Sequence, residues 1–322
     1  MSKRDHGPIL VEPKIKRVNH VLANAIDELV NPPRGIPLSR WPEFQRRFGG
    51  FRPHEYSIIC GATGSGKTAF VTSMSAQLVE QNERHLVMSI ETGHLDFVRR
   101  VASVFAGVDL NDGDGLNKAK QDALMNLAVP ILNNGALHLS EYDNRLSVEQ
   151  LMHDLRYARE KLGCRVAFVD NLNFLLTVDK FTDVNQEMDR VTHELIIFCK
   201  RIDMHIVMIM HPKKNSNPRD LRVESEFEIK GSSTAVQEAQ NIFLFNRPKP
   251  DDDAHSKFER EVIIAKMRRR GQFVHESVWF QYRDASYFES PNQTRFLVPV
   301  PNAKTGEGAK WTGYKPSITP NL

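Results

Sequence analysis

Long apolar stretches are missing from this sequence. The 322 residues contain no apolar run of about 18 or more, the length that a transmembrane helix requires. Residues 1–17, MSKRDHGPILVEPKIKR, contain no apolar core and do not resemble a secretory signal. We therefore expect a cytoplasmic protein, in the host cytoplasm if a phage encodes it, with no membrane partner.

Cysteine is scarce and the net charge is small. The three cysteines, Cys60, Cys164 and Cys199, are widely spaced and match no metal-binding pattern, so we expect reduced thiols in the core. A net charge of +3 does not by itself indicate a nucleic-acid partner. Basic residues gather instead in the run KMRRR at 266–270 and after Ser290, where a solvated surface is the simplest interpretation.

Composition divides the chain into three parts. Apolar residues recur at helical spacing over 16–30, and Asn31-Pro-Pro ends the run, which predicts a short amphipathic helix. Beyond Ser290, Pro, Gly, Asn, Thr and Lys dominate, which predicts a flexible tail. The expected parts are an N-terminal arm and linker helix over 1–34, a main domain over 35–289 and a tail over 290–322.

The main domain alternates strand-like runs with helical patterns. Apolar residues spaced three and four apart predict helices over 147–162, with a Ser147–Gln150 capping box, and over 183–202. Strand–helix alternation predicts an α/β fold whose central sheet is mostly parallel and flanked by helices, extended by a final hairpin-like set of strands. The expected strands are Tyr56–Cys60, His85–Glu91, Leu137–Ser140, Val166–Asp170, His205–Met210, Asn241–Asn246, Glu261–Lys266 and Val278–Tyr282.

Residues 61–68 read GATGSGKT, after the apolar run SIIC and before a helical pattern. This is the P-loop motif in its required context. Its glycines let backbone amides turn inward around phosphates, Lys67 supplies a positive charge, and Thr68 supplies a hydroxyl to Mg²⁺. We therefore expect ATP, or another nucleoside triphosphate, with Mg²⁺. The expected nucleotide-binding residues are Gly61, Ala62, Thr63, Gly64, Ser65, Gly66, Lys67 and Thr68.

Three further predicted strands end in residues that can complete such a site. Asp170 ends the run VAFVD, where a carboxylate can hold Mg²⁺, and we expect its strand to lie beside the P-loop strand. Glu91 follows LVMSI and can orient or deprotonate the attacking water, although a glutamate favoured by a helix dipole would give the same pattern. His211 follows IVMIM, and we expect it to contact the γ-phosphate.

The ordered set of motifs resembles the RecA-like helicase domain of hexameric replicative DNA helicases, a family that includes the DnaB type, Twinkle and phage primase–helicases. The resemblance covers about residues 16–288 and implies a RecA-like P-loop NTPase core behind a linker helix. Besides the P-loop, the segments that carry it are SIE at 89–91, FVDNLNF at 168–174, HPKK at 211–214, IKGSSTAVQEAQ at 229–240 and KMR at 266–268.

The resemblance implies roles for two basic segments. Arg268 is implied to be an arginine finger and Lys266 its companion, both reaching the γ-phosphate of a neighbouring copy; a shifted register would make Arg269 or Arg270 the finger. A long loop at 212–233 is implied to contact DNA without reading sequence, with solvated loop charges as the alternative. The expected DNA-binding residues are Lys213, Lys214, Arg219, Arg222, Lys230, Gly231 and Ser233.

We therefore expect an ATP-dependent helicase that translocates on single-stranded DNA as a homo-oligomeric ring, hexameric in the resembled family, and unwinds duplex DNA. The helix at 16–30 would pack on the next subunit, as in that family, or on its own domain. No primase domain is recognisable, so a separate primase, loader or polymerase is an expected partner. A RecA/RadA-like recombination ATPase and a nucleotide-switched helicase loader or scaffold remain alternatives.

Overall fold

The structure, a computed structural model, describes residues 17–31, 34–111, 115–141, 147–170, 184–213, 222–230, 233–249, 258–270 and 275–290. The predicted tail beyond Ser290 and the predicted DNA-binding residues Lys214, Arg219 and Gly231 lie outside these ranges. Within them, no helix has the length and apolar character needed to cross a bilayer.

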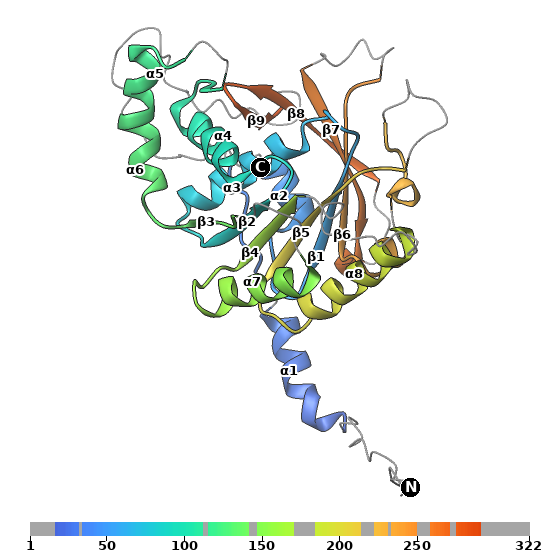
Figure 1. The fold of residues 1–322 in the computed structure, drawn as a ribbon. Coiled ribbons are helices and arrows are strands. Elements are labelled where there is room, and N and C mark those ends of the chain that lie inside the picture. Colours follow the sequence, from blue (N-terminus) through green and yellow to red (C-terminus); the bar gives the residue numbers. More distant parts are fainter. Residues whose placement is uncertain are drawn as a thin grey trace, which may run out of the picture.

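The described residues form one mixed sheet of nine strands at the centre of the molecule (Figure 1). Its order is β3-β2-β4-β5-β1-β6-β7-β8-β9, parallel from β3 to β6 and antiparallel from β6 to β9. The expected parallel core and hairpin-like extension are confirmed, and β9 is an additional strand. The strands are β1 (Tyr56–Cys60), β2 (His85–Ser89), β3 (Leu137–Leu139), β4 (Val166–Asp170), β5 (His205–Met210), β6 (Asn241–Asn246), β7 (Glu259–Met267), β8 (Glu276–Arg283) and β9 (Ser286–Glu289).

Strand β5 lies between β4 and β1. It pairs with β1 at Tyr56↔Ile206 and with β4 at Val166↔His205. The expectation that the strand ending in Asp170 lies beside the P-loop strand is therefore wrong. The end of β4 is two strand spacings, roughly 10 Å, from the end of β1, and the Asp170 carboxylate must cover part of that separation to reach the P-loop.

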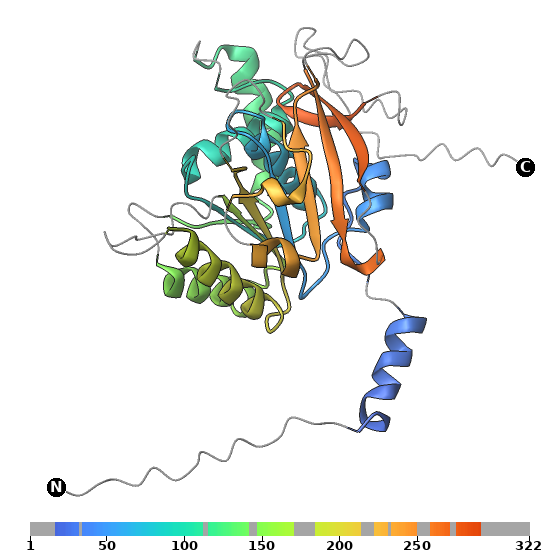
Figure 2. The same cartoon turned by 90° about the vertical axis from the view of Figure 1, so that its right-hand side faces the viewer.

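Helices cover both faces of the sheet because the central strands are apolar on both sides. In β1, Ile58 and Cys60 pack in the cluster with α7 and α8, whereas Ile59 packs in the cluster with α2, α3 and α4. Figures 1 and 2 show the two helical layers with the sheet between them. The helices of the body are α2 (Pro42–Phe48), α3 (Lys67–Glu80), α4 (His94–Ala106), α5 (Lys118–Ala123), a π-helical turn at Leu124–Ala128, α6 (Val129–Leu132), α7 (Val148–Glu160), α8 (Val184–Cys199) and α9 (Ser233–Glu238), with 3-10 turns at Glu226–Glu228 and Arg268–Arg270.

Helix α1 (Asn19–Val30) extends away from the body of the molecule in both views (Figures 1 and 2). Its apolar side chains are open to solvent, with Leu22 49%, Ile26 51% and Leu29 80% exposed. The helix predicted over 16–30 is thus present from Asn19, and the domain of its own chain does not cover it. A helix of this length is marginal in water by itself, so its apolar face needs a partner.

An aromatic cluster joins the start of the domain to its last strand. The Trp41 ring stacks on Phe70 of α3, with centroids 4.7 Å apart, and Trp41 Nε1 donates to the carbonyl oxygen of Tyr287 at 3.0 Å. The Glu289 carboxylate accepts from the main-chain nitrogens of Glu43 and Phe44 at 3.1 and 2.7 Å, which satisfies orphan donors at the start of α2. The helix that begins inside the P-loop is therefore fixed by residues from both ends of the domain.

Candidate active site

The P-loop connects β1 to α3, and two of its glycines are required by close contacts. A Cβ at Gly66, where φ is 109°, would lie 2.3 Å from Tyr287 Oη. A Cβ at Gly61 would lie 2.4 Å from the carbonyl oxygen of Phe245. The loop therefore follows a path that only glycine fits, and it ends at the amino terminus of α3, where backbone amides favour an anion.

Lys67 is buried within the loop that it ends. Its Nζ donates to the carbonyl oxygens of Gly61 and Ala62 at 2.8 and 2.9 Å. Burial lowers the pKa of Lys67, whereas the nearby Asp170 and Glu91 carboxylates act in the opposite direction. The ammonium is therefore held at the centre of the loop by weak neutral acceptors, which a phosphate can replace with a stronger charge-assisted contact.

Thr68 and Asp170 form the oxygen-rich side of the site. Thr68 Oγ1 donates to Asp170 Oδ2 at 2.9 Å, and Asp170 is only 3% exposed. Burial raises the pKa of Asp170 to about 6, while the Thr68 hydrogen bond opposes that shift. Ser65 Oγ is also buried and has no hydrogen-bond partner among the described residues. A hydroxyl, a carboxylate and an unpaired hydroxyl fit Mg²⁺, which prefers oxygen ligands and keeps several waters.

Glu91 and His211 meet the same edge of the sheet. Strand β2 ends at Ser89, two residues before its predicted end, and the main-chain nitrogens of Ile90 and Glu91 then donate to the carbonyl oxygen of Asp170 at 2.8 and 3.3 Å. His211 Nε2 lies 3.8 Å from Glu91 Oε2. Burial lowers the pKa of His211 and the Lys67 ammonium adds to this, whereas Glu91 opposes it. The structure therefore brings the three predicted strand-end residues together beside the P-loop.

Residues of the antiparallel strands also contact the P-loop, and the sequence analysis did not find them. Arg247 Nη2 donates to the carbonyl oxygen of Gly64 at 2.7 Å, and Arg260 Nε donates to that of Ser65 at 2.8 Å. Tyr287 of β9 approaches Gly66. These residues follow no local motif, because only the order of β6, β7, β8 and β9 brings them to the loop.

A protein-family model described as the DnaB-like helicase C-terminal domain matches residues 35–289. The chain belongs to this family. The match covers the whole sheet and every site residue described above, from the P-loop on β1 to Tyr287 on β9.

Two relatives illustrate how distant this DnaB-like chain is from named helicases. A DNA helicase/primase of Enterobacteria phage T3 is 22% identical over 271 residues, which are 82% of this chain and 46% of the relative. The replicative DNA helicase DnaB of Helicobacter pylori is 20% identical over 320 residues, 94% of this chain and 64% of the relative. The chain thus spans about half to two-thirds of these relatives.

Solved structures agree with the DnaB-like fold. One solved ATPase domain superposes with a TM-score of 0.73 at 17% identity, and the match covers 86% of this chain and 99% of that domain. A DnaB-like replicative helicase, solved for its interactions with primase, gives a TM-score of 0.71 at 17% identity over 85% of this chain and 67% of that one. The RecA-like fold of this family is therefore shown.

Arg268 lies far from the P-loop of its own DnaB-like chain. Its neighbour Met267 pairs with Asn241 at the start of β6, and Asn241 pairs with Ser57 near the start of β1. The P-loop follows Cys60 at the other end of β1, roughly 10 Å further along the strand. Arg268 thus occupies the opposite edge of the sheet, and phosphates in the P-loop of the same chain are out of its reach.

The side chain of Lys266 is turned into its own chain. It is 9% exposed, and its Nζ donates to the main-chain oxygens of Val236 and Gln237. This differs from the expectation of a lysine extended towards a neighbour, because these carbonyls at the end of α9 already satisfy the ammonium.

Arg222 is not available for DNA in this arrangement. Its guanidinium is only 13% exposed, donates to the main-chain oxygen of Arg247 at 2.6 Å and forms an ion pair with Glu261 of β7. The expectation that Arg222 faces DNA is therefore corrected. An ion pair of this burial holds both partners, since removing one would leave the other charge uncompensated.

The other described members of the predicted DNA-binding set lie near the sensor histidine. Lys213 Nζ donates to the main-chain oxygen of Phe227 at 2.9 Å at an exposed position. Lys230 follows Ile229, which forms a bridge with Pro212, and its main-chain nitrogen donates to the carbonyl oxygen of His211 at 2.9 Å. Ser233 begins α9. The segments 211–213 and 228–230 are therefore joined side by side.

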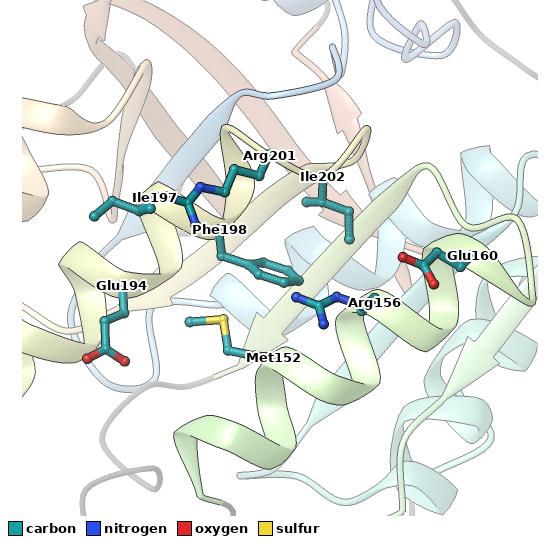
Figure 3. Close-up of a pocket in the computed structure, with 8 residues that line it drawn as sticks. All are labelled: Met152, Arg156, Glu160, Glu194, Ile197, Phe198, Arg201 and Ile202. Atoms are coloured by element: carbon teal, nitrogen blue, oxygen red, sulfur yellow. The ribbon is translucent and has the colours of Figure 1, made fainter. Parts of the chain in front are cut away.

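A cavity of about 370 Å³ lies apart from this site, between α7 and α8 (Figure 3). Apolar side chains and the Arg156 guanidinium, which lies over the Phe198 ring, line it. None of its lining residues comes from the P-loop or from the strand ends that carry Glu91, Asp170 and His211. The chemistry of the P-loop edge therefore does not extend to this cavity.

Proposed function

We propose that the chain is the ATP-hydrolysing motor of a replicative-type DNA helicase, which moves along single-stranded DNA as a ring and separates duplex DNA. The observation that carries the proposal is the gathering of Glu91, Asp170 and His211 around Lys67 and Thr68, in a chain of the DnaB-like helicase family. Named helicases among the relatives favour this function over a recombination ATPase or a loader.

Within one subunit the residues divide the work of phosphoryl transfer. The amides of 61–66 and the Lys67 ammonium hold the β- and γ-phosphates, and Thr68 with Asp170 would hold Mg²⁺, which supplies positive charge to the phosphates. Glu91 orients or deprotonates the attacking water. His211 contacts the γ-phosphate, and its junction with Lys230 gives that contact a route to the loop proposed to bind DNA.

The site is completed by a second copy. Arg268 serves the P-loop of the neighbouring subunit, because it lies at the wrong edge of the sheet for its own. A closed ring, hexameric in this proposal, follows from such head-to-tail contacts. Arg269 and Arg270 stand in the same 3-10 turn and are the alternatives for this role.

The proposed partners follow from this assembly. Single-stranded DNA passes along Lys213, Lys230 and Ser233, together with Lys214, Arg219 and Gly231 from the same loop, through backbone contacts. A separate primase, loader or polymerase works with the ring in the cytoplasm. The linker and tail divisions at residues 34 and 290 belong to the same proposal.

The test is unwinding of a forked DNA duplex by the purified protein with ATP and Mg²⁺. We expect strand separation by the wild type, and none by Lys67→Ala, which removes the ammonium that holds the phosphates. ATP turnover is measured in parallel, and normal turnover by Lys67→Ala would discard the P-loop assignment. Strand pairing without unwinding would indicate a recombination ATPase, and turnover unaffected by DNA would indicate a loader or scaffold.

A further inference from the structure

Helix α9 ends against two basic residues of β7 and the turn that follows. Lys266 Nζ donates to the main-chain oxygens of Val236 and Gln237 at 2.6 and 2.8 Å, and Arg268 Nη2 donates to that of Gln237 at 2.9 Å. The main-chain nitrogen of Arg268 also donates to the oxygen of Gln240 at 2.8 Å. The carbonyls at the carboxyl end of α9, which have no partners within the helix, are thus satisfied from one neighbouring segment.

Burial commits Lys266 to this contact. The residue is 9% exposed, and an ammonium removed from water needs acceptors close by. Burial lowers the pKa of Lys266, and the Arg268 charge acts in the same direction, while Glu226 opposes both. If Lys266 left to bind a phosphate elsewhere, two carbonyls would lose their donor. Arg268 is held less firmly, because its side chain is exposed.

The other end of α9 faces the segment proposed to contact DNA. The helix begins at Ser233, three residues after Lys230, and its six residues span roughly 9 Å. The buried side chains of Val236 and Ala239 hold α9 in the core, and the main-chain nitrogen of Gln240 donates to the oxygen of Tyr56 at 2.9 Å. A single short helix therefore lies between the DNA side of the molecule and the residue proposed as the finger.

We propose that Lys266 is a positioning residue, which fixes Arg268 to the last turn of α9 so that movement of the DNA-contacting segment moves the arginine serving the neighbouring site. The inference rests on the proposed function and deepens it. Lys266 then acts through Arg268 and does not itself touch the γ-phosphate. DNA binding would change turnover because it changes where the guanidinium stands.

The first test compares Lys266→Met, Lys266→Arg and Lys200→Met in the full chain. Lys266→Met keeps the length but removes the donor, and we expect the ratio of ATP turnover with and without oligo(dT) to fall at least five-fold. Affinities for fluorescent ATP analogue and for oligo(dT) are expected to stay within two-fold. Lys266→Arg retains N–H donors and should recover at least half of the ratio.

Lys200→Met is the matched control. Lys200 Nζ donates to the Glu238 carboxylate at 3.1 Å, so this variant also removes a lysine contact from α9, but on its exposed side and without a link to β7. We expect its ratio to stay within two-fold of the wild type. A loss equal to that of Lys266→Met would overturn the proposal, because any disturbance of α9 would then suffice.

A second measurement avoids turnover. Hydrogen exchange is followed in peptides over 229–240 and 259–270 with and without oligo(dT) and a non-hydrolysable nucleotide. In the wild type both peptides should change on DNA binding, whereas in Lys266→Met only the first should. Lys266→Gln, which keeps an N–H donor, replaces Lys266→Met if melting curves show that the latter does not fold.

The two proposals fail in different ways. If Lys266→Met weakens nucleotide binding ten-fold and keeps its stimulation by DNA, Lys266 is a phosphate ligand and the positioning role is overturned. If the wild type is stimulated by DNA and Lys266→Met equally so, only the positioning role fails. A wild type whose turnover ignores DNA overturns the proposed function and the inference with it.

Discussion

Burial decides which charged residues of this protein remain available for work. Arg222 and Lys266 both stand in segments to which the sequence gave outward roles, yet each is satisfied within the chain, by Glu261 and by α9. Lys67 is buried too, but its acceptors are weak loop carbonyls that a phosphate can replace. The difference is chemical, since an ion pair holds its partners more firmly than a neutral carbonyl does.

At the residue scale, the finger assignment predicts complementation between two inactive variants. Arg268→Ala and Glu91→Gln are each expected to reduce ATP turnover strongly, by roughly 10³-fold or more for the arginine. Mixed subunits can form a site with Glu91 from one copy and Arg268 from the next, and random mixing at equal amounts gives such sites at about a quarter of the interfaces of a ring. Turnover of the mixture measures this recovery.

A matched pair controls for mixing itself. Glu91→Gln and Lys67→Ala both damage the P-loop side of the interface, so no combination of the two creates an intact site, and no recovery is expected. Arg268→Ala with Glu91→Gln giving no more turnover than this control, at any ratio, would count against a finger acting between subunits.

His205 predicts a pH dependence of stability. Its ring nitrogens lie 2.8 Å from Ser57 Oγ and 2.8 Å from the main-chain oxygen of Arg52, and burial lowers its pKa to about 3. The unfolded chain binds a proton near pH 6.5, and the folded chain does not, so the stability present above that pH is lost as pH falls towards 3. The expected slope well below pH 6.5 is about 1.4 kcal/mol per pH unit.

Urea unfolding between pH 7 and 5 checks this slope. His205→Gln should flatten it by up to one proton, whereas His153→Gln should leave it unchanged, because the His153 side chain is 70% exposed. Equal slopes in the wild type and His205→Gln would refute the explanation.

At the scale of elements, α2 and β9 lock the helix that starts in the P-loop. Trp41 is fully buried, stacks on Phe70 of α3 and reaches Tyr287 of β9 by a hydrogen bond. Because α3 carries Lys67 and Thr68 in its first turn, looseness in this packing would reach the phosphate site. Residues remote from the chemistry thus hold its geometry.

Removing that anchor should destabilise the domain. Trp41→Ala is expected to lower the free energy of unfolding by roughly 3–5 kcal/mol, the cost of a large core cavity. Trp41→Phe keeps a ring and should cost less, roughly 1–3 kcal/mol, mainly for the unpaired Tyr287 carbonyl. Denaturant unfolding measures both, with Tyr157→Ala on the exposed surface of α7 as the control near zero. A Trp41→Ala loss below 1 kcal/mol would contradict the packing argument.

At the scale of the whole molecule, the most telling feature is a helix that its own domain leaves bare. The apolar face of α1 and the placement of Arg268 away from its own P-loop are independent observations, and both are satisfied by a second copy of the chain. The proposed ring uses one for adhesion and the other for catalysis.

This arrangement predicts the effect of charge on α1. The double variant Leu22→Asp/Ile26→Asp should weaken self-association at least ten-fold, because both side chains lie on the bare apolar face, while the free energy of unfolding changes by less than about 0.5 kcal/mol. Sedimentation velocity at several protein concentrations measures assembly. His20→Asp places a charge on the opposite side of the helix and should leave assembly intact; rings that persist in the double variant would show that α1 does not hold subunits together.

The sequence by itself determined what depends on neighbours along the chain. The P-loop, the alternation of strands and helices, and the helix over 148–160 with Ser147 as its cap are written in short-range patterns of glycine, apolar spacing and capping residues. Nearly every strand was predicted within a few residues. The strand ends also located Glu91, Asp170 and His211, because the carboxyl ends of parallel strands share one edge of a sheet.

Only the tertiary structure decided which of these segments meet. The insertion of β5 between β4 and β1, the contacts of Arg247 and Arg260 with the P-loop, and the burial of Arg222 depend on pairings between distant parts of the chain. The Trp41–Tyr287 contact, for example, spans 246 residues. Local propensity carries no record of such pairings, since they are selected by the packing of whole faces against one another.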